Sequence, residues 1–197
     1  GKAKNTFIQG VFMQSESKNR NGRMYPKKVM ESAVKKYIKE QVSKGRAVGE
    51  LNHPDGPTIN LDKVSHRITN LEFEGNNVVG KALILNTPMG KVVKGLIEGG
   101  VQLGVSSRGM GSLETKNDMS VVKDDYHLAT IDIVQDPSAP EAFVNGILEG
   151  VEWVWNNGIL KEADVQEIKD VIVKEFIKVK PDESALASSF ERFMSRL

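Results

Sequence analysis

The sequence predicts an α+β fold, with a body of mixed strands and helices followed by a helical C-terminal extension. Three observations predict this class. Strand-like apolar runs recur between turn residues up to about residue 135, two segments within them carry apolar residues at helical spacing, and helical spacing dominates beyond Pro140. A chain of 197 residues, 39% hydrophobic and 27% charged, can bury a core and has the composition of a soluble protein.

Composition excludes several function classes. A net charge of +1 gives no reason to expect nucleic acid or an anionic membrane as partner. The absence of cysteine excludes disulfides, thiolate metal sites and cysteine nucleophiles. No apolar run approaches the ~18 residues that a membrane span needs. Gly1 stands where an initiator Met would, and we interpret it as a processing or cloning remnant, so the natural N-terminus is expected to be missing.

The first elements follow from local pattern. A strand is predicted over residues 6–13, followed by a turn-rich segment at residues 19–23. Pro26 suits the first turn of a helix, because its missing N–H has no partner there anyway. The helix is predicted to reach Gly45, since one apolar stripe recurs at helical spacing: Val29, Met30, Ala33, Val34, Tyr37, Ile38 and Val42.

The middle of the chain reads mainly as strands. Alternation predicts a strand over residues 47–51, and two more, at 64–73 and 78–85, are joined by a hairpin bend at residues 75–77. A short helix is predicted from Pro88 to the glycine pair at 99–100. Two further strands are expected at residues 101–107 and 126–134, with a polar excursion over 114–125 between them.

Beyond Pro140 the sequence predicts helices. They are expected at residues 142–156, 161–178 and, after Pro181, 184–197. The chain is therefore divided into a body, residues 1–146, and a helical C-terminal extension, residues 147–197.

His53 and Ser106 are residue types of a serine hydrolase site. A serine hydroxyl becomes an effective nucleophile when a base accepts its proton, and histidine is the usual base near neutral pH. Taken alone, a histidine before proline is more often a turn or surface residue. Here Pro54 restricts His53 to extended conformations at the end of a strand-like run, which would aim its side chain. Local sequence leaves the two interpretations balanced.

Two serines compete as nucleophile. In a strand, Ser106 shares a face with Gly104, which leaves room for a substrate, whereas Ser107 shares the opposite face with apolar Leu103 and Val105. Ser106 is therefore the preferred nucleophile and Ser107 the reserve. One residue of slip would exchange their faces.

Asp132 is the preferred third group, because a carboxylate within an apolar strand is costly unless something pairs with it. His127 competes for this place, although its odd separation from Asp132 puts the two on opposite faces. His66 is expected on the solvated surface. Arg108 and Gly109 follow the serines, and a backbone N–H beside an arginine suggests an oxyanion site, although a surface arginine in a turn is the commoner case.

Metal hydrolysis is a weaker hypothesis. His53 and Glu50 would need His66 or His127 as further ligands, and no His-Glu-x-x-His motif is present. No metal and no cofactor are therefore predicted.

Four stretches, in order, resemble the prohead core protein proteases of T-even-type tailed bacteriophages: residues 19–26, 49–54, 104–109 and 137–140. The resemblance implies an assemblin-like fold, a β-barrel or sheet core surrounded by helices, related to the herpesvirus assembly protease. It implies a serine endopeptidase with His53 as general base, Ser106 as nucleophile and Asp132 as orienting acid.

The same resemblance implies the biology. The substrates would be the phage scaffold or core proteins and the major capsid protein, cut inside the immature capsid in the host cytoplasm, and a homo-oligomer is expected. Cleavage would follow Glu, in the context Leu or Ile, any residue, Glu, then Gly or Ala. A cationic pocket should hold that Glu, with Arg23, Arg46 and Arg108 as its possible walls.

The extension contains this pattern at Glu149-Gly150 and Glu162-Ala163, which suggests self-cleavage of a zymogen. Before removal, the extension would hold the zymogen to the scaffold or cover the site. Glu98-Gly99 also fits, but it lies in the body, where folding should protect it. The main rival is a non-catalytic capsid-core or tube protein on the same fold, which would have no reason to bring His53, Ser106 and Asp132 together.

Overall fold

The structure is a computed structural model that describes residues 5–56, 58–148, 151–156 and 159–164. Residues 5–147 form one compact unit, which contains every residue predicted to take part in catalysis. Within the described residues, no helix combines the length and the apolar character that a membrane crossing requires.

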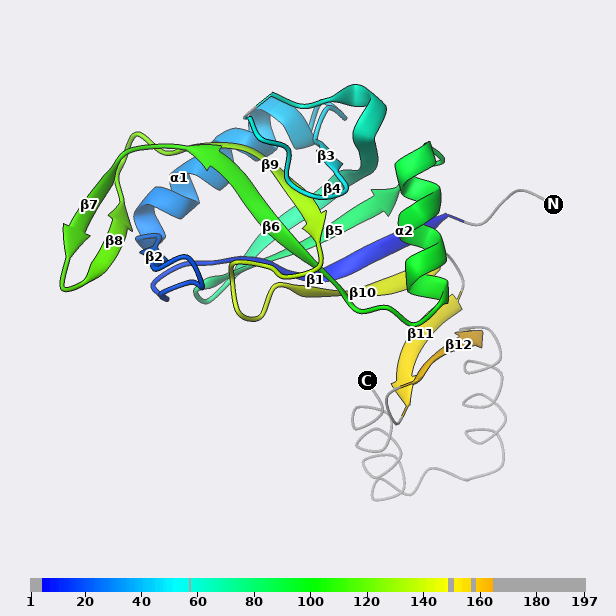
Figure 1. Ribbon diagram of the computed structural model, residues 1–197. Coiled ribbons are helices and arrows are strands. Elements are labelled where there is room, and N and C mark those ends of the chain that lie inside the picture. Colours follow the sequence, from blue (N-terminus) through cyan, green and yellow to red (C-terminus); the bar gives the residue numbers. More distant parts are fainter. Residues whose placement is uncertain (1–4, 57, 149–150, 157–158, 165–197) are drawn as a thin grey trace, which may run out of the picture. The chain divides into compact units, whose positions relative to one another are not determined.

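The body is built on one antiparallel sheet (Figure 1). Its strands are β1 (Thr6–Gln14), β3 (Val48–Glu50), β4 (Val64–Glu74), β5 (Asn77–Ile84), β6 (Leu103–Met110), β9 (His127–Val134) and β10 (Phe143–Leu148). Neighbouring strands follow the order β10-β1-β5-β4-β3, and β6 pairs with both β10 and β9. The β4–β5 hairpin has the predicted bend, with Gly75 at a positive φ of 62°.

The sheet curls until its edge strands β3 and β9 meet, but it does not close into a barrel. One isolated parallel bridge, between Leu51 and Ile133, joins them in place of a ladder. β3 has only three residues, and the chain then turns away at Asn52, whose φ is +68°. The barrel suggested by the family resemblance is therefore corrected to an open, curled sheet.

Two longer helices accompany the sheet in the part of the chain described. α1 (Lys27–Tyr37) continues as a π-helical turn, η1 (Ile38–Val42), and packs on β9. α2 (Pro88–Glu98) packs on β4 and β5, and the Thr87 side chain caps its N-terminus by accepting from the N–H of Gly90 at 3.1 Å. Both helices were predicted. Among the described residues, helices do not surround the sheet, because it is accompanied only by α1 with its π-helical turn, by α2 and by a short 3-10 turn, η2 (Leu61–Lys63).

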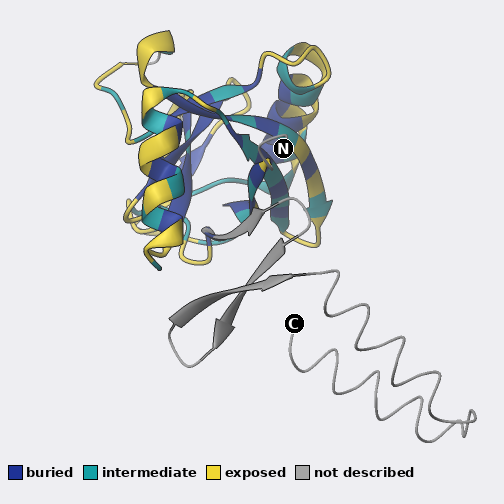
Figure 2. Ribbon diagram, turned by 90° about the vertical axis from the view of Figure 1, so that its right-hand side faces the viewer, coloured by how far each residue is buried: buried dark blue, intermediate teal, exposed yellow. Residues whose placement is uncertain are grey.

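Burial follows the predicted pattern in the body. The apolar stripe of α1 is buried, and Figure 2 shows the buried residues on the inner surfaces of the elements and the exposed ones on the outer faces of the helices. The six largest fully buried side chains are all apolar: Ile8, Phe12, Met30, Ile68, Ile131 and Ile133.

The expected polar excursion is a small second sheet. β7 (Leu113–Lys116) and β8 (Met119–Val122) form a hairpin, and β2 (Arg23–Met24) pairs in parallel with β8. The hairpin turn is Asn117-Asp118, with positive φ at both residues. Asn and Asp tolerate that conformation, and it matches the twist of a two-residue hairpin. The Asn117-Asp118 pair was the sequence signal that would have predicted this hairpin.

The predicted helix over residues 142–156 is wrong. Residues 143–148 form β10, and β11 (Val151–Asn156) pairs antiparallel with β12 (Ile159–Asp164). Val151, Trp153 and Trp155 alternate with other residues, and β-branched and aromatic residues in this pattern favour strands. The predicted helix at 161–178 begins within β12 and otherwise lies, like the one at 184–197, outside the described residues.

Candidate active site

Ser106 and Asp132 face each other across the β6–β9 ladder. They are direct partners in its register, so their side chains project from the same face of the sheet. Both are buried, and Asp132 is fully inaccessible. Residues that lie 26 positions apart are thus brought opposite each other by strand pairing, as the hypothesis of a shared site requires.

His53 reaches this pair from the loop after β3. Its ring Nδ1 lies 2.7 Å from Oδ2 of Asp132, while 40% of the side chain stays exposed. The left-handed backbone of Asn52 redirects the chain at this point, and the Asn52 N–H donates to the carbonyl of Ile133 at 2.7 Å. An Nδ1–H that donates to the carboxylate leaves Nε2 of the neutral ring as a proton acceptor.

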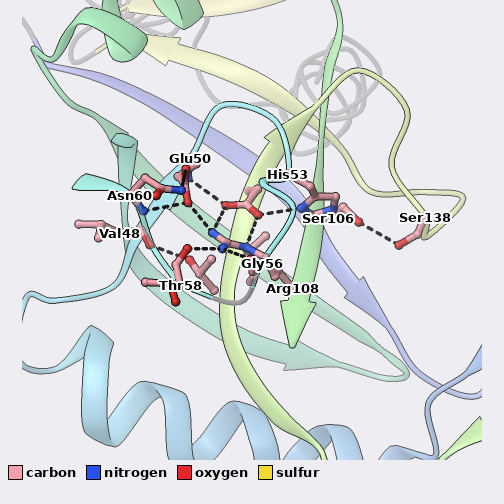
Figure 3. A network of polar contacts seen from close by, with 12 residues as sticks. Val48, Glu50, His53, Gly56, Thr58, Asn60, Ser106, Arg108 and Ser138 are labelled. Carbon is pink, nitrogen blue, oxygen red and sulfur yellow. Dashed lines mark hydrogen bonds and ion pairs between the residues drawn. The ribbon is translucent and has the colours of Figure 1, made fainter. Parts of the chain in front are cut away.

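Arg108 is buried and lies in the same network of polar contacts as Glu50 and His53 (Figure 3). Its Nε donates to Oδ2 of Asp132 at 2.9 Å, and Nη2 donates to Oδ1 at 3.2 Å. Nη2 also donates to Glu50 at 2.8 Å, and Nη1 donates to the carbonyls of Gly56 and Thr58, each at 3.0 Å. These contacts use all five N–H donors of a guanidinium.

The Asp132 carboxylate accepts four hydrogen bonds. Besides the two from Arg108 and the one from His53, the backbone N–H of Glu50 donates to Oδ1 at 3.0 Å. Burial by itself would raise the pKa of Asp132, but these hydrogen bonds and the charge of Arg108 outweigh it and hold that pKa below its ordinary value. Asp132 is therefore an ionised acceptor near neutral pH.

From the sequence, Glu50 was considered only as a metal ligand beside His53. It is buried at the end of β3, pairs with Arg108, and accepts from both the backbone N–H and the side-chain amide of Asn60, at 3.2 and 3.1 Å. The sequence signal for a role in the site was a carboxylate at the end of a short apolar strand, three residues before a histidine. Glu50 and Arg108 together hold the loop that carries His53.

Ser138 is the second residue that sequence reasoning missed. Its hydroxyl lies 2.9 Å from the hydroxyl of Ser106, and its carbonyl accepts from the N–H of Arg20. Among the described residues, the Ser138 hydroxyl is the hydrogen-bond partner of Ser106 Oγ. Ser138 lies within the stretch 137–140 that supported the family resemblance, although no role followed from that stretch.

His53 and Ser106 line one cleft of about 680 Å³. Ser107 and the exposed Arg23 also line it, and exposed apolar side chains of Met110 and Leu113 border it. A cleft that joins a base, two hydroxyls, a cation and apolar surface suits a peptide substrate.

Comparison with known proteins identifies the family. The family model described as prohead core protein serine protease matches residues 1–152. The chain belongs to this family of phage prohead proteases.

A sequence relative and a solved structure, both from phage T4, resemble the chain. The prohead core protein protease of Enterobacteria phage T4 is 41% identical over 143 residues, which cover 70% of this chain and 67% of the relative. The solved structure of the bacteriophage T4 capsid assembly protease matches with a TM-score of 0.61 and 36% identity, covering 65% of this chain and 80% of that chain. The resemblance inferred from the four sequence stretches is thereby confirmed, as is the mixed, strand-rich fold.

The remaining histidines of this prohead protease lie elsewhere. His127 is exposed at the start of β9. His66 was expected on the surface, which is wrong: it is fully buried on β4, with Nδ1 2.8 Å from the Ser65 hydroxyl and Nε2 2.8 Å from the carbonyl oxygen of Ile131. Burial lowers the pKa of His66 to about 4. Among the described residues, no three side chains of metal-ligating type converge.

The three arginines proposed to surround a substrate Glu are separated by the structure. Arg46 is exposed and lies outside the residues that line the cleft, and the guanidinium of Arg108 is fully committed to protein acceptors. The prediction that the Arg108 side chain is a wall of the pocket for the substrate Glu is therefore corrected. Arg23 alone of the three remains exposed within the cleft.

Proposed function

We propose that this prohead protease is a serine endopeptidase in which Ser106 is the nucleophile, His53 the general base and Asp132 the group that orients the base. The observation that carries the proposal is the 2.7 Å contact between His53 Nδ1 and Asp132 Oδ2, at a cleft where Ser106 lies opposite Asp132. A non-catalytic capsid-core or tube protein would have no reason to pair His53 with a buried carboxylate beside a cleft that Ser106 also lines.

The chemistry follows from this arrangement. His53 Nε2 takes the proton of Ser106 Oγ as the oxygen attacks the scissile carbonyl, and ionised Asp132 stabilises the imidazolium. The imidazolium then returns the proton to the leaving amine, which leaves an ester between Ser106 and the substrate. Water, activated by the same imidazole, hydrolyses that ester. The hydroxyl of Ser138 holds Ser106 Oγ in place before the attack.

The proposed oxyanion donor is the backbone N–H of Gly109, because the Arg108 side chain has no donor left. Successive residues of a strand direct their N–H groups to opposite edges, so every second residue shares an edge. The N–H of Val105 points away from β9, since it donates to the carbonyl of Ala142 at 2.9 Å. Two and four residues further along β6, Ser107 and Gly109 would share that edge, which borders the cleft.

The proposed specificity is cleavage after Glu, in the context Leu or Ile, any residue, Glu, then Gly or Ala. Arg23 supports it, as an exposed guanidinium that lines the cleft and can bind a carboxylate in bidentate geometry. Alternate side chains of an extended peptide lie on one face, so the apolar residue two positions before Glu would be directed to the same wall of the cleft.

The proposed substrates are the scaffold or core proteins and the major capsid protein of a phage. The proposed location is the interior of the immature capsid in the host cytoplasm, where a homo-oligomer would act. Support comes from the similarity in sequence to a T4 prohead core protein protease and in fold to the solved T4 capsid assembly protease.

The test is peptide cleavage by the full chain and by its Ser106→Ala and Ser107→Ala variants, with products mapped by mass spectrometry. The peptides carry Ile-x-Glu-Gly or, as a control, Ile-x-Gln-Gly. We expect cleavage after Glu by the wild type and by Ser107→Ala, and none by Ser106→Ala. Cleavage by Ser106→Ala but not by Ser107→Ala would transfer the nucleophile to Ser107. A wild type that cuts no peptide would favour the structural protein.

A further inference from the structure

Arg108 and Glu50 form a buried ion pair directly behind the proposed catalytic carboxylate. We propose that this pair is a positioning device: Arg108 fixes the orientation of Asp132, and Glu50 offsets the charge of Arg108 so that Asp132 can still stabilise a protonated His53. The inference rests on the proposed function, and it gives roles to two residues that do not touch the substrate.

The geometry of Arg108 carries the first step. Its Nε and Nη2 bind the two oxygens of Asp132 at 2.9 and 3.2 Å, a fork that matches the plane of the carboxylate. Because the carboxylate cannot rotate without breaking both bonds, Oδ2 stays aimed at His53 Nδ1. A lysine could supply the charge but not this planar pair of donors.

Glu50 carries the second step, which is electrostatic. Without Glu50, the positive charge of Arg108 would largely cancel the negative charge that Asp132 presents to His53. Glu50, at 2.8 Å from Nη2 of the same guanidinium and 1% exposed, returns the cluster to a net charge of −1. Burial strengthens both effects, because charges inside the protein are poorly screened.

The same pair also ties the loop that carries His53. Arg108 binds the carbonyls of Gly56 and Thr58, and Glu50 binds the backbone and side chain of Asn60. The segment after His53 is therefore anchored at three residues to one charge cluster. Figure 3 shows these contacts running from Asn60 and Glu50 through Arg108 toward His53.

Other charged or titratable groups near this cluster act on wild type and variants alike. Arg23 and Asp55 line the cleft beside His53. Tyr37 on α1 and His66 on β4 lie within electrostatic range of Asp132, and both are buried and neutral near pH 7. None of them is changed in the experiment below, so differences between variants report on Arg108 and Glu50.

The experiment measures kcat, KM and the pH dependence of kcat/KM for the full chain and three variants. Arg108→Lys keeps the charge but loses the fork, so kcat should fall roughly 100-fold, as expected for a displaced catalytic group, with the acidic limb of the profile unmoved. Arg108→Met removes a positive charge, favours protonated imidazole, and should move the acidic limb to higher pH. Glu50→Gln removes a negative charge and should move the limb to lower pH. Each shift should be about one pH unit.

Opposite shifts distinguish positioning from a merely structural role, because partial unfolding lowers the amplitude of the profile without moving its limb. Arg46→Met is the matched control, since it removes the same charge from an exposed site outside the cleft, and it should leave the profile unchanged. If Arg108→Met does not fold, the nearly isosteric Glu50→Gln decides the question alone.

An NMR titration of the His53 imidazole in the same variants measures how Arg108 and Glu50 affect its protonation. It needs no substrate. If the wild type cleaves and the acidic limbs of Arg108→Met and Glu50→Gln lie at the same pH as that of the wild type, the inference is overturned. The proposed peptidase function then still stands. A wild type that never cleaves overturns the proposed function. In that case, opposite NMR shifts would still support the coupling, and unmoved ones would overturn it too.

Discussion

At the scale of single residues, the site depends on how one carboxylate is surrounded. Asp132 lies in an apolar strand, yet it accepts from a backbone N–H, a histidine and a guanidinium. Burial and hydrogen bonding act on its pKa in opposite directions, and the hydrogen bonds prevail. The charge of Asp132 is thus available to His53 at neutral pH.

Asp132→Asn should lower kcat/KM by about 10⁴, because an amide stabilises the wrong tautomer of His53 and cannot stabilise the imidazolium. Peptide cleavage measures the loss. Asp124→Asn, an exposed residue outside the cleft, is the control and should keep full activity. A loss smaller than tenfold in Asp132→Asn would mean that another group orients His53.

The same substitution should reduce stability in a pH-dependent way. Since the pKa of Asp132 is depressed on folding, its contribution is present above the ordinary value of 3.8 and is lost as pH falls through the lower folded value. At pH 7 we expect Asp132→Asn to lose about 3 kcal/mol, because Arg108 is left partly uncompensated. Urea unfolding should show that difference shrinking below about pH 4. An unchanged difference at low pH would contradict this assignment.

At the scale of elements, the junction of β3 with β9 brings His53 to Asp132. β3 approaches so closely that a Cβ on Gly49 would overlap the Ile131 carbonyl oxygen and the ring of His66. His66 in turn contacts that carbonyl oxygen from β4, across the narrow β3 strand. This close approach places Glu50 against Asp132.

Gly49→Ala should destabilise the protein by about 1–3 kcal/mol, since the backbone at Ile131 and the buried, hydrogen-bonded ring of His66 must move to admit the methyl group. It should also lower activity by displacing Glu50. Gly95→Ala on α2 is the control, because open space surrounds that position. The control should be neutral or stabilising by about 0.5–1 kcal/mol. Urea unfolding at pH 7 compares them, and equal stabilities would show that β3 can shift freely.

His66 should make stability fall on the acid side of neutrality. Because its folded pKa is about 4 and its ordinary value is 6.5, the unfolded chain takes up the proton first as pH falls through this window. Above about pH 6.5 the group contributes no pH dependence. The loss accumulates toward pH 4 and then levels off, at on the order of 3 kcal/mol.

His66→Gln keeps a donor for Ile131 and an acceptor for Ser65 but does not titrate. The difference in unfolding free energy between wild type and this variant should therefore fall from pH 6.5 to pH 4 and stay level above pH 6.5. Denaturant unfolding at several pH values measures it. A constant difference across that window would contradict a neutral, buried His66.

At the scale of the whole molecule, the described body contains the complete candidate site, and the proposed self-cleavage sites lie beyond it. Glu162 and Ala163 belong to β12 and pair with Trp153 and Glu152 of β11. Cutting there requires that β12 first leave its ladder, because a peptidase binds an unpaired segment. Glu149-Gly150 falls outside the described residues.

Purified wild-type chain should trim itself during long incubation, giving products that end at Glu149 and Glu162. Ser106→Ala should keep Leu197 as its C-terminus. Glu98-Gly99 should remain uncut, because Glu98 belongs to α2, which packs on the sheet. Intact-mass spectrometry follows the products. Persistence of Leu197 in an active wild type would end the self-trimming hypothesis.

Much of the body could be predicted from sequence, because its elements depend on neighbouring residues. The stripe of α1, the Pro88 start of α2, and the alternation in β4 and β5 are all local patterns, and the structure has each of them. The chemistry of histidine and serine, with the four family stretches, selected two residues that line one cleft in the structure. Local pattern failed at β10 and β11, where apolar residues fit both periods and strand pairing decided between them.

The sequence by itself thus determined the mixed strand-and-helix class of the body, the family and the residue types of the candidate site. Only the tertiary structure decided that Arg108 faces inward, that Glu50 and Ser138 belong to the site, and that His66 is buried. The physical reason is that a buried polar group takes its role from its partners, and these lie far along the chain. The N–H of Glu50, for example, meets a carboxylate 82 residues away, a contact that no local period can encode.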